Sequence, residues 1–184
     1  MADDRPALRR RLRAARRAVP AAGRSIAAAA IDRALARLGL PKPGTRISAF
    51  QPFDGEIDPG VVLRRARAIG CTVFFPVVTS LRARRMRFVA PADDGGATIG
   101  PRWLDLVLVP LVGFDPRGHR LGMGAGLYDR HFAFLRHRRA WRRPLLVGIA
   151  FEAQKVERLA EAEHDVQLDG VVTDRGVYGR IAGR

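Results

Sequence analysis

The sequence has a single cysteine, Cys71, among its 184 residues. One thiol cannot form a disulfide within the chain, so we expect a protein of a reducing compartment, the cytoplasm. No uninterrupted run reaches the roughly 18 apolar residues that a membrane-spanning helix needs. Charged residues near the N-terminus are not followed by an apolar segment, so we expect neither a secretory signal nor a membrane partner.

Lysine and aromatic residues are also scarce. Only Lys42 and Lys155 are lysines, so arginines supply nearly all of the positive charge behind a formal net charge of +15. A basic surface attracts nucleotides, polycarboxylates, nucleic acid or acidic lipid, and charge alone does not choose among them. Aromatic residues make up 7% of the chain, the arginines are spread through every segment, and no nucleic-acid-binding motif is recognisable. We therefore do not expect nucleic acid as the partner.

Two common kinds of catalytic site are missing. The four histidines and Cys71 do not recur at the spacing of a zinc site. No G-x-S-x-G segment is present, so a serine hydrolase of that type is not supported.

The periodicity of the apolar residues predicts an α/β fold. Helical spacing predicts helices over 6–19, 24–38, 59–69 and 128–137. Apolar or alternating runs predict strands over 46–51, 72–78, 84–89, 104–112, 145–151 and 170–174. Because strands alternate with helices, we expect one domain over residues 1–184, a three-layer αβα sandwich with a mostly parallel central sheet and a basic N-terminal helix.

The first predicted helix has an apolar face and a basic stripe. The stripe carries Arg5, Arg9, Arg13 and Arg16. From the residues alone, such a stripe is best interpreted as a solvated face.

The strongest local signal is RLGMGAGLYD at 120–129, a glycine-rich loop between a predicted buried strand and a helix. Glycines let a backbone approach a phosphate, and ligands of open α/β sheets bind beyond the carboxyl ends of the strands. The G-x-G-x-G spacing matches neither the dinucleotide fingerprint nor the Walker pattern. Two interpretations stay open: a phosphate loop in which Arg120 adds donors, and a flexible start of a helix that binds no ligand.

Three acidic positions stand out. Asp129 lies in the first turn of the last predicted helix, where it can complement the helix dipole or hold magnesium beside phosphates. Asp58 is expected to cap the helix that follows it. Glu56, at the exit of a predicted strand, has no evident structural duty and could contact a ring N–H of a substrate. His164 and Asp165, taken alone, are typical of a surface loop.

Taken together, these segments resemble the 5-formyltetrahydrofolate cyclo-ligase family, also called methenyltetrahydrofolate synthetases. The matching stretches follow the family's order over roughly residues 5–174. They are RPALRRRLRAARR, AFQPFDGEID, FFPVV, DLVLVPLVGFDPRGHRLGMGAGLYDR, GIAFEAQ and HDVQLDGVVTD. The central block, a strand ending in VP followed by FD and then RLGxGxGxYDR, is the most specific part.

The resemblance implies an ATP- and Mg²⁺-dependent enzyme that cyclises 5-formyltetrahydrofolate to 5,10-methenyltetrahydrofolate and releases ADP and phosphate. ATP would phosphorylate the formyl oxygen, N10 of the folate would attack the activated carbon, and phosphate would leave. Positioning and charge neutralisation suffice for such a transfer, so no catalytic nucleophile is assigned. A basic rim would attract the polyanionic glutamate tails that folates often carry. We expect a monomer or a weak dimer.

The resemblance also implies roles for individual residues. The positions that match the family's ATP site are Arg5, Arg9, Arg120, Leu121, Gly122, Met123, Gly124, Ala125, Gly126, Leu127 and Tyr128. Those that match the folate site are Gln51, Glu56 and Leu127, with Glu56 on the pterin. Asp129 and Asp165 match magnesium ligands. The solvated-face interpretation therefore gives way for Arg5 and Arg9, whereas Arg13 and Arg16 keep it.

Three departures from the family pattern are visible. Leu127 stands where an aromatic residue is usual, so ring stacking on the folate is lost or supplied elsewhere. Met123 and Ala125 occupy variable loop positions, and the methyl group of Ala125 requires that its backbone avoid positive φ. The segment between Arg87 and Asp105 is short and lacks an I-P-E-P-like stretch. These departures keep open a relative that binds nucleotide or folate without turnover, beside the less favoured nucleic-acid-binding protein.

Overall fold

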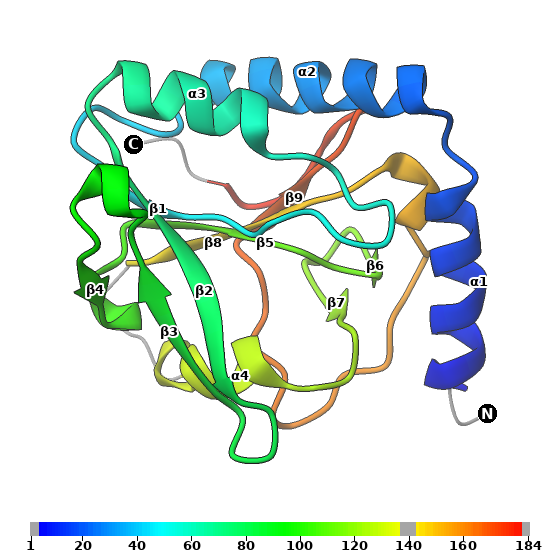
Figure 1. Cartoon of the computed structure of the whole chain (residues 1–184). Coiled ribbons are helices and arrows are strands. Elements are labelled where there is room, and N and C mark those ends of the chain that lie inside the picture. The colour runs from blue at the N-terminus through cyan, green and yellow to red at the C-terminus, as the bar shows by residue number, and fades with distance from the viewer. Residues whose placement is uncertain (1–3, 137–142, 182–184) are drawn as a thin grey trace.

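The structure is a computed structural model that describes residues 4–136 and 143–181. Its centre is an eight-stranded sheet (Figure 1). The parallel strands, in spatial order, are β9 (Gly170–Val172), β8 (Leu145–Ile149), β5 (Leu106–Val109), β1 (Arg46–Ser48) and β2 (Thr72–Ser80). Antiparallel strands extend the edges, with β10 (Val177–Gly179) beside β9, and β3 (Arg85–Val89) and β4 (Thr98–Ile99) beyond β2. The predicted α/β fold with a mostly parallel sheet is confirmed.

Helices cover both faces of this sheet. Two long helices, α2 (Ala21–Arg37) and α3 (Gly60–Ala68), lie together on one face (Figure 1). The other face carries α4 (Leu127–His131). Short 3₁₀ turns lie at Ala92–Asp94, Pro101–Trp103, Ala133–Leu135 and Glu152–Gln154. Among the described residues, no helix combines the length and apolar character that crossing a membrane requires.

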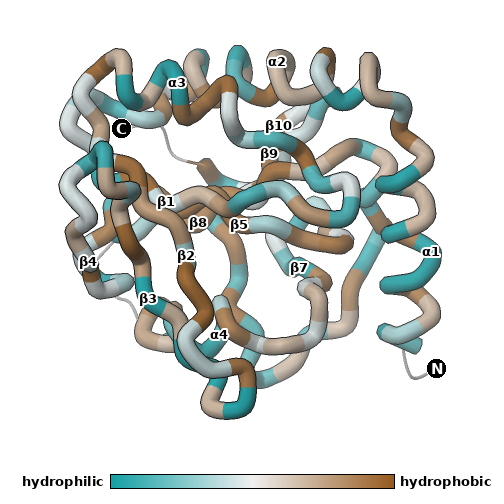
Figure 2. The backbone as a smooth tube through the Cα atoms, in the orientation of Figure 1, coloured by the Kyte–Doolittle hydropathy of each residue, from teal (hydrophilic) through white to brown (hydrophobic). Residues whose placement is uncertain are grey.

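The strand β5 shows why the sheet is buried on both faces. All four of its residues are buried, and alternate side chains enter different clusters. Leu106 and Leu108 join the cluster under α2 and α3, which includes Ile31 and Leu35. Val107 and Val109 join the cluster on the other face. The apolar strands are the brown segments at the centre of Figure 2. An unbroken apolar run is the pattern that such a strand requires.

Short elements at the edges differ from the prediction. The strands β4 and β10 were not predicted, and the predicted loop after β5 contains a hairpin of β6 (Gly113–Phe114) and β7 (Arg120–Leu121). Strands of two or three residues are too short for alternation to show. The last predicted helix is too long, because the α-helix ends at His131 and Phe132 takes a non-helical conformation. Residues 137–142, which include the end of that prediction, lie outside the described residues.

The helix α1 (Arg5–Arg17) stands at the end of the sheet beside β6 and β7 (Figure 1). The solvated-face interpretation is wrong for Arg16, whose side chain is 0% exposed. Its guanidinium donates to Asp54 Oδ2 at 2.9 Å, to Glu56 Oε1 at 3.3 Å and to the Leu111 carbonyl at 3.4 Å. Arg13 remains partly exposed, but it also donates to Asp54, at 2.8 Å. The part of the stripe with Arg13 and Arg16 therefore faces carboxylates of the loop after β1.

This buried cation generates a stability prediction. Arg16→Met should lower the free energy of unfolding by about 3 kcal/mol, because the largely buried Glu56 carboxylate then loses its arginine and Asp54 keeps only Arg13 and Arg17. Arg11→Met makes the same charge change at an exposed position of α1 and should alter it by less than about 0.5 kcal/mol. Chemical denaturation at pH 7 measures both variants. Equal losses would show that Arg16 stabilises the protein no more than a surface arginine.

Candidate functional site

Most of the predicted site residues line one cavity of about 270 Å³. It lies beyond the carboxyl ends of β5 and β1, since Pro110 follows β5 and Glu56 lies in the loop after β1. Ligands of parallel sheets bind at this edge. Its lining comprises Arg5, Arg9, Glu56, Pro110, Leu111, Arg120, Gly122, Met123, Gly124, Ala125, Gly126, Leu127, Tyr128, Asp129 and Asp165. The fold thus brings together the N-terminal helix, the loop after β1, the glycine-rich loop and a segment near the C-terminus.

Two predicted residues are not part of this lining. Leu121 is 2% exposed and packs with Leu12 and Val112, so its side chain belongs to the core under α1. Gln51 is exposed at the start of the loop that follows β1. Leu121 belongs to the glycine-rich segment, but its side chain in β7 points into the core and not into the cavity.

The glycine-rich loop is held against α1. Arg9 Nε donates to the Gly122 carbonyl at 2.9 Å. Gly124 and Gly126 have φ of +104° and +63°, a conformation that glycine adopts without strain. Asp54 and Arg84 are the only described non-glycine residues with positive φ, so Ala125 avoids that region as expected. The loop therefore presents backbone to the cavity beside an arginine.

Each predicted magnesium ligand is paired with an arginine. Asp129, in the first turn of α4, accepts from Arg120 Nη2 and from the Val166 N–H at 3.0 Å. Asp165 accepts from Arg5 Nη2 at 3.1 Å and from the Ala162 N–H at 3.2 Å. About a third of each carboxylate side chain is exposed. Both carboxylates are fixed in place and remain accessible from the cavity.

The donor set suits magnesium only with help from a ligand. Within residues 4–136 and 143–181, no group of three or more His, Cys, Asp or Glu residues could hold a metal. Magnesium is commonly held by one or two carboxylates together with substrate phosphates. Asp129 and Asp165 therefore fit a magnesium–phosphate complex rather than a metal site made of protein alone.

Glu56 and Tyr128 both line the cavity and influence each other electrostatically. Burial raises the pKa of the Glu56 carboxyl, and bonds from the Phe53 N–H at 3.2 Å and from Arg16 only partly offset it. Burial also raises the pKa of Tyr128, opposed by the charge of Arg120 and aided by that of Glu56. The expectation that Glu56 has no structural duty is wrong, since it helps to hold the Arg16 cation.

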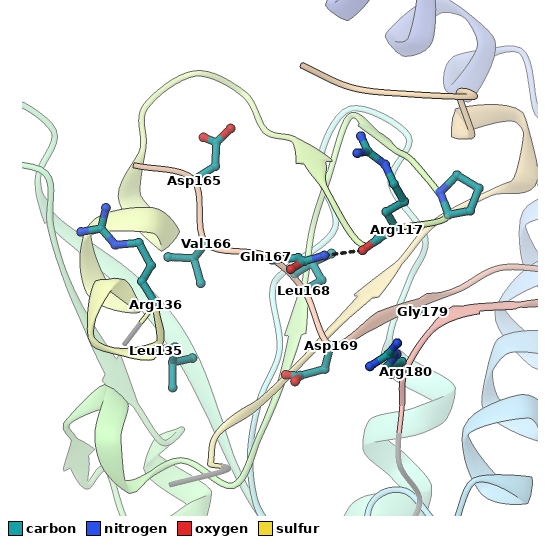
Figure 3. Close-up of a pocket in the computed structure, with 11 residues that line it drawn as sticks. Arg117, Leu135, Arg136, Asp165, Val166, Gln167, Leu168, Asp169, Gly179 and Arg180 are labelled. Carbon is teal, nitrogen blue, oxygen red and sulfur yellow. Dashed lines mark hydrogen bonds between the residues drawn. The ribbon is translucent and has the colours of Figure 1, made fainter. Parts of the chain in front are cut away.

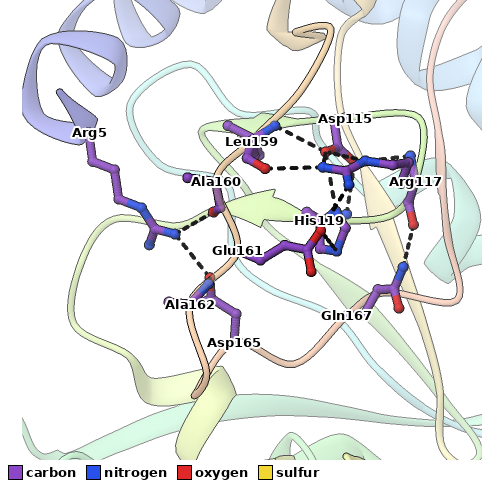
Figure 4. A network of polar contacts seen from close by, with 10 residues as sticks. All are labelled: Arg5, Asp115, Arg117, His119, Leu159, Ala160, Glu161, Ala162, Asp165 and Gln167. Atoms are coloured by element: carbon purple, nitrogen blue, oxygen red, sulfur yellow. Dashed lines mark hydrogen bonds and ion pairs between the residues drawn. The ribbon is translucent and has the colours of Figure 1, made fainter. Parts of the chain in front are cut away.

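Asp115 is a buried carboxylate that the sequence analysis did not predict as functional, and it supports the site without lining the cavity. Asp115, between β6 and β7, is 0% exposed and accepts from the N–H groups of Arg117, His119 and Leu159 at 3.0–3.1 Å (Figure 4). Burial would raise its pKa, but these bonds and the Arg117 side chain outweigh burial and lower it. Asp115 thereby ties the segment that leads to Asp165 against the β6–β7 turn. Its FD motif was part of the resemblance, which was the available signal.

A larger cavity lies elsewhere among the described residues. It measures about 930 Å³ and is lined by residues such as Arg117, Arg136 and Arg180 (Figure 3). Of the residues predicted for the site, only Asp165 is among its described lining residues. Size alone therefore does not identify the candidate site, which is defined by where the glycine loop, the arginines and the carboxylates meet.

The chain is similar in sequence to proteins of one family. The sequence model of the 5-formyltetrahydrofolate cyclo-ligase family matches residues 1–174. The 5-formyltetrahydrofolate cyclo-ligase of Escherichia coli K12 is 32% identical over 148 residues, which are 72% of this chain and 79% of that protein. That of Mycoplasma pneumoniae is 30% identical over 178 residues, 93% of this chain and 99% of that protein.

Solved structures give the same result. A 5,10-methenyltetrahydrofolate synthetase from Mycoplasma pneumoniae aligns with a TM-score of 0.78 at 29% identity, covering 94% of this chain and 99% of that one. The synthetase from Aquifex aeolicus aligns with a TM-score of 0.76 at 25% identity, covering 98% and 94%. The sheet, α1 and the glycine loop thus lie within a fold shared over nearly the whole chain.

The arginines around the site also generate a pH prediction. Arg17 chiefly, with Arg13, holds the pKa of Asp54 down at about 2 against the opposing effect of burial. A depressed carboxyl pKa stabilises the fold above its unfolded value of about 4, and this contribution disappears as pH falls from about 4 to about 2. The free energy of unfolding of Asp54→Asn should therefore be about 2 kcal/mol lower at pH 7 than that of the wild type. It should also fall less steeply as the pH is lowered from about 4 to about 2.

Denaturation curves recorded between pH 7 and pH 2.5 measure this effect. Asn tolerates the positive φ of this position, so the backbone is kept. Asp93→Asn, at an exposed position, serves as the control and should follow the wild-type profile. An unchanged pH profile in Asp54→Asn would contradict the assignment of the depressed pKa.

Proposed function

Because this chain belongs to the 5-formyltetrahydrofolate cyclo-ligase family, a family of enzymes, we propose that it cyclises 5-formyltetrahydrofolate to 5,10-methenyltetrahydrofolate with ATP and Mg²⁺. One observation carries the proposal: most of the residues that the resemblance assigns to ATP, folate and magnesium line one cavity, although they come from four distant segments. ADP and phosphate would be the other products.

The proposed reaction needs a phosphoryl group beside the formyl oxygen. In this proposal Arg5, Arg9 and Arg120 neutralise the phosphates of ATP along the glycine-rich loop. A bound magnesium ion, held by Asp129 and Asp165, would withdraw charge from the transferred phosphoryl group. The two carboxylates would exchange arginine partners for the metal, which frees Arg120 and Arg5 to meet phosphate oxygens.

Glu56 is suited to the folate end of the cavity. Its carboxylate is buried, lies near Tyr128 and is held by Arg16 from behind. A buried carboxylate accepts hydrogen bonds strongly, so it can orient the N–H groups of a pterin ring. Leu127 borders the same cavity and packs on the core beside Tyr128, where its aliphatic side chain cannot stack as a ring would.

The first test is direct turnover. Purified protein with 5-formyltetrahydrofolate, Mg²⁺ and ATP should form the methenyl product, followed by its near-ultraviolet absorbance. Asp129→Ala should lower kcat/KM at least about 100-fold, because a magnesium ligand is lost and the negative charge of the transferred phosphoryl group is then less well stabilised. Asp93→Ala, an exposed carboxylate away from the cavity, should retain wild-type rates. A rate of product formation that depends neither on magnesium nor on Asp129 would contradict the assigned metal site.

A second variant separates the two substrates. Glu56→Gln should raise KM for the folate about tenfold or more while KM for ATP stays within about twofold, since Glu56 is assigned to the pterin alone. If wild-type protein binds ATP or folate and forms no product, the chain is instead the non-catalytic relative that Leu127 and the short 87–105 segment keep open.

A further inference from the structure

A second cavity, of about 410 Å³, opens beside the candidate site. The two cavities share Gly126, Asp129 and Asp165. The rim of the second carries Arg84, Arg130, Arg136 and His164, none of which the resemblance assigns to a ligand. Glu56 lines only the first cavity, so the second opens on the side of the two aspartates and away from the proposed pterin end.

Arg84 reaches this place from the tip of a hairpin. The strands β2 and β3 project beyond the sheet, and their turn approaches α4 (Figure 1). The turn is closed by bonds from the Arg84 N–H to the Leu81 carbonyl at 3.2 Å and from the Ala83 N–H to Ser80 Oγ at 3.0 Å. A Cβ atom built on Gly126 would lie 3.6 Å from Arg84 Nη1. The guanidinium therefore lies against the glycine-rich loop.

Arg9 approaches the same loop from another element. A Cβ atom built on Gly124 would lie 3.8 Å from Arg9 Cζ. Alternate glycines of the loop thus each face a guanidinium, one from α1 and one from the hairpin. Arginine forks bind phosphate oxygens bidentately, and two of them beside one backbone loop suit a phosphate chain.

The backbone of Arg84 offers an independent indication. Its φ is +49°, in the left-handed region that glycine and asparagine favour at such turns. An arginine there costs of order 1 kcal/mol, and such strain is often found at ligand-binding positions. Across residues 4–136 and 143–181, the guanidinium of Arg84 has no hydrogen-bond or ion-pair partner, whereas those of Arg5, Arg9 and Arg120 each have at least one. The strained residue presents a cation free to bind an anion.

We propose that Arg84 is a substrate-contacting residue whose guanidinium binds a phosphate of the nucleotide on loop 122–126, opposite Arg9. This inference rests on the proposed function, which places nucleotide phosphates on that loop. It adds a hairpin-borne cation to the site and assigns the second cavity to the polyphosphate side. The hairpin residue contributes charge and hydrogen bonds and exchanges no atom with the substrates.

The test uses a variant that should keep the fold. Arg84→Gly removes the guanidinium and relieves the positive φ, so its melting temperature should equal or exceed that of the wild type. Calorimetric titration with Mg·ADP should show about tenfold weaker binding. Arg82→Ala removes an exposed arginine from the same hairpin, away from both cavities, and should change binding by less than about twofold. Arg84→Lys should fall between, because it keeps the charge and loses the fork.

Steady-state kinetics then identify the anion. Arg84→Gly should raise KM for ATP and leave KM for the folate unchanged. Wild-type Mg·ADP affinity in Arg84→Gly overturns the inference. So does a rise confined to KM for the folate, above all for substrates with glutamate tails, since the anion would then be a folate carboxylate.

The same titration separates this inference from the proposed function. A wild-type protein that binds nucleotide without turnover contradicts the activity, yet the comparison of Arg84→Gly with Arg82→Ala still decides the role of Arg84. A wild-type protein that binds no nucleotide overturns both proposals.

Discussion

The buried guanidinium of Arg16 is the contact on which the candidate site depends. It joins α1 to Asp54, to Glu56 and to the backbone at Leu111, just beyond β5. Because α1 also carries Arg5 and Arg9, this cation sets the basic face of the helix against the end of the cavity that holds Glu56. A buried charge with several fixed acceptors tolerates little displacement, so it specifies one position for the helix. The core beneath α1 is small, which makes this polar contact more decisive for its placement.

Charge in the cavity follows a simple balance. Asp129 and Asp165 each pair with one arginine, and Arg9 bonds a backbone carbonyl. Cations therefore outnumber the carboxylates at the aspartate side, and Arg84 and Arg130 add to the excess. Such an excess of positive charge favours a ligand with several negative charges. A metal ion would add to the excess, so it would bind here only together with a ligand that brings anionic groups.

Periodicity predicted the elements whose pattern is set by burial. The four residues of β5 show an unbroken apolar run because both faces of the sheet are covered, and α2 shows helical spacing because one face meets the core. The strands β4, β6, β7 and β10 carry too few residues for a period, so alternation does not reveal them even though each pairs with a strand that is adjacent in sequence. The stripe of arginines on α1 looks the same whether it meets water or carboxylates, and Asp54 lies 38 residues beyond Arg16. Resemblance supplied most of the cavity, whereas Arg84 and Asp115 required the hairpin and the β6–β7 turn to be placed.

The ion pair of Arg5 and Asp165 has a consequence for folding during translation. Its members lie 160 residues apart, and Asp115 holds the later segment in place. During translation, the helix with Arg5 leaves the ribosome long before its partner has been synthesised. In the nascent chain, Arg5 therefore lacks its Asp165 partner during the time in which the earlier strands of the sheet can begin to pair. The lining of the candidate cavity is therefore complete only after the segment with Asp165 has been synthesised and has met α1.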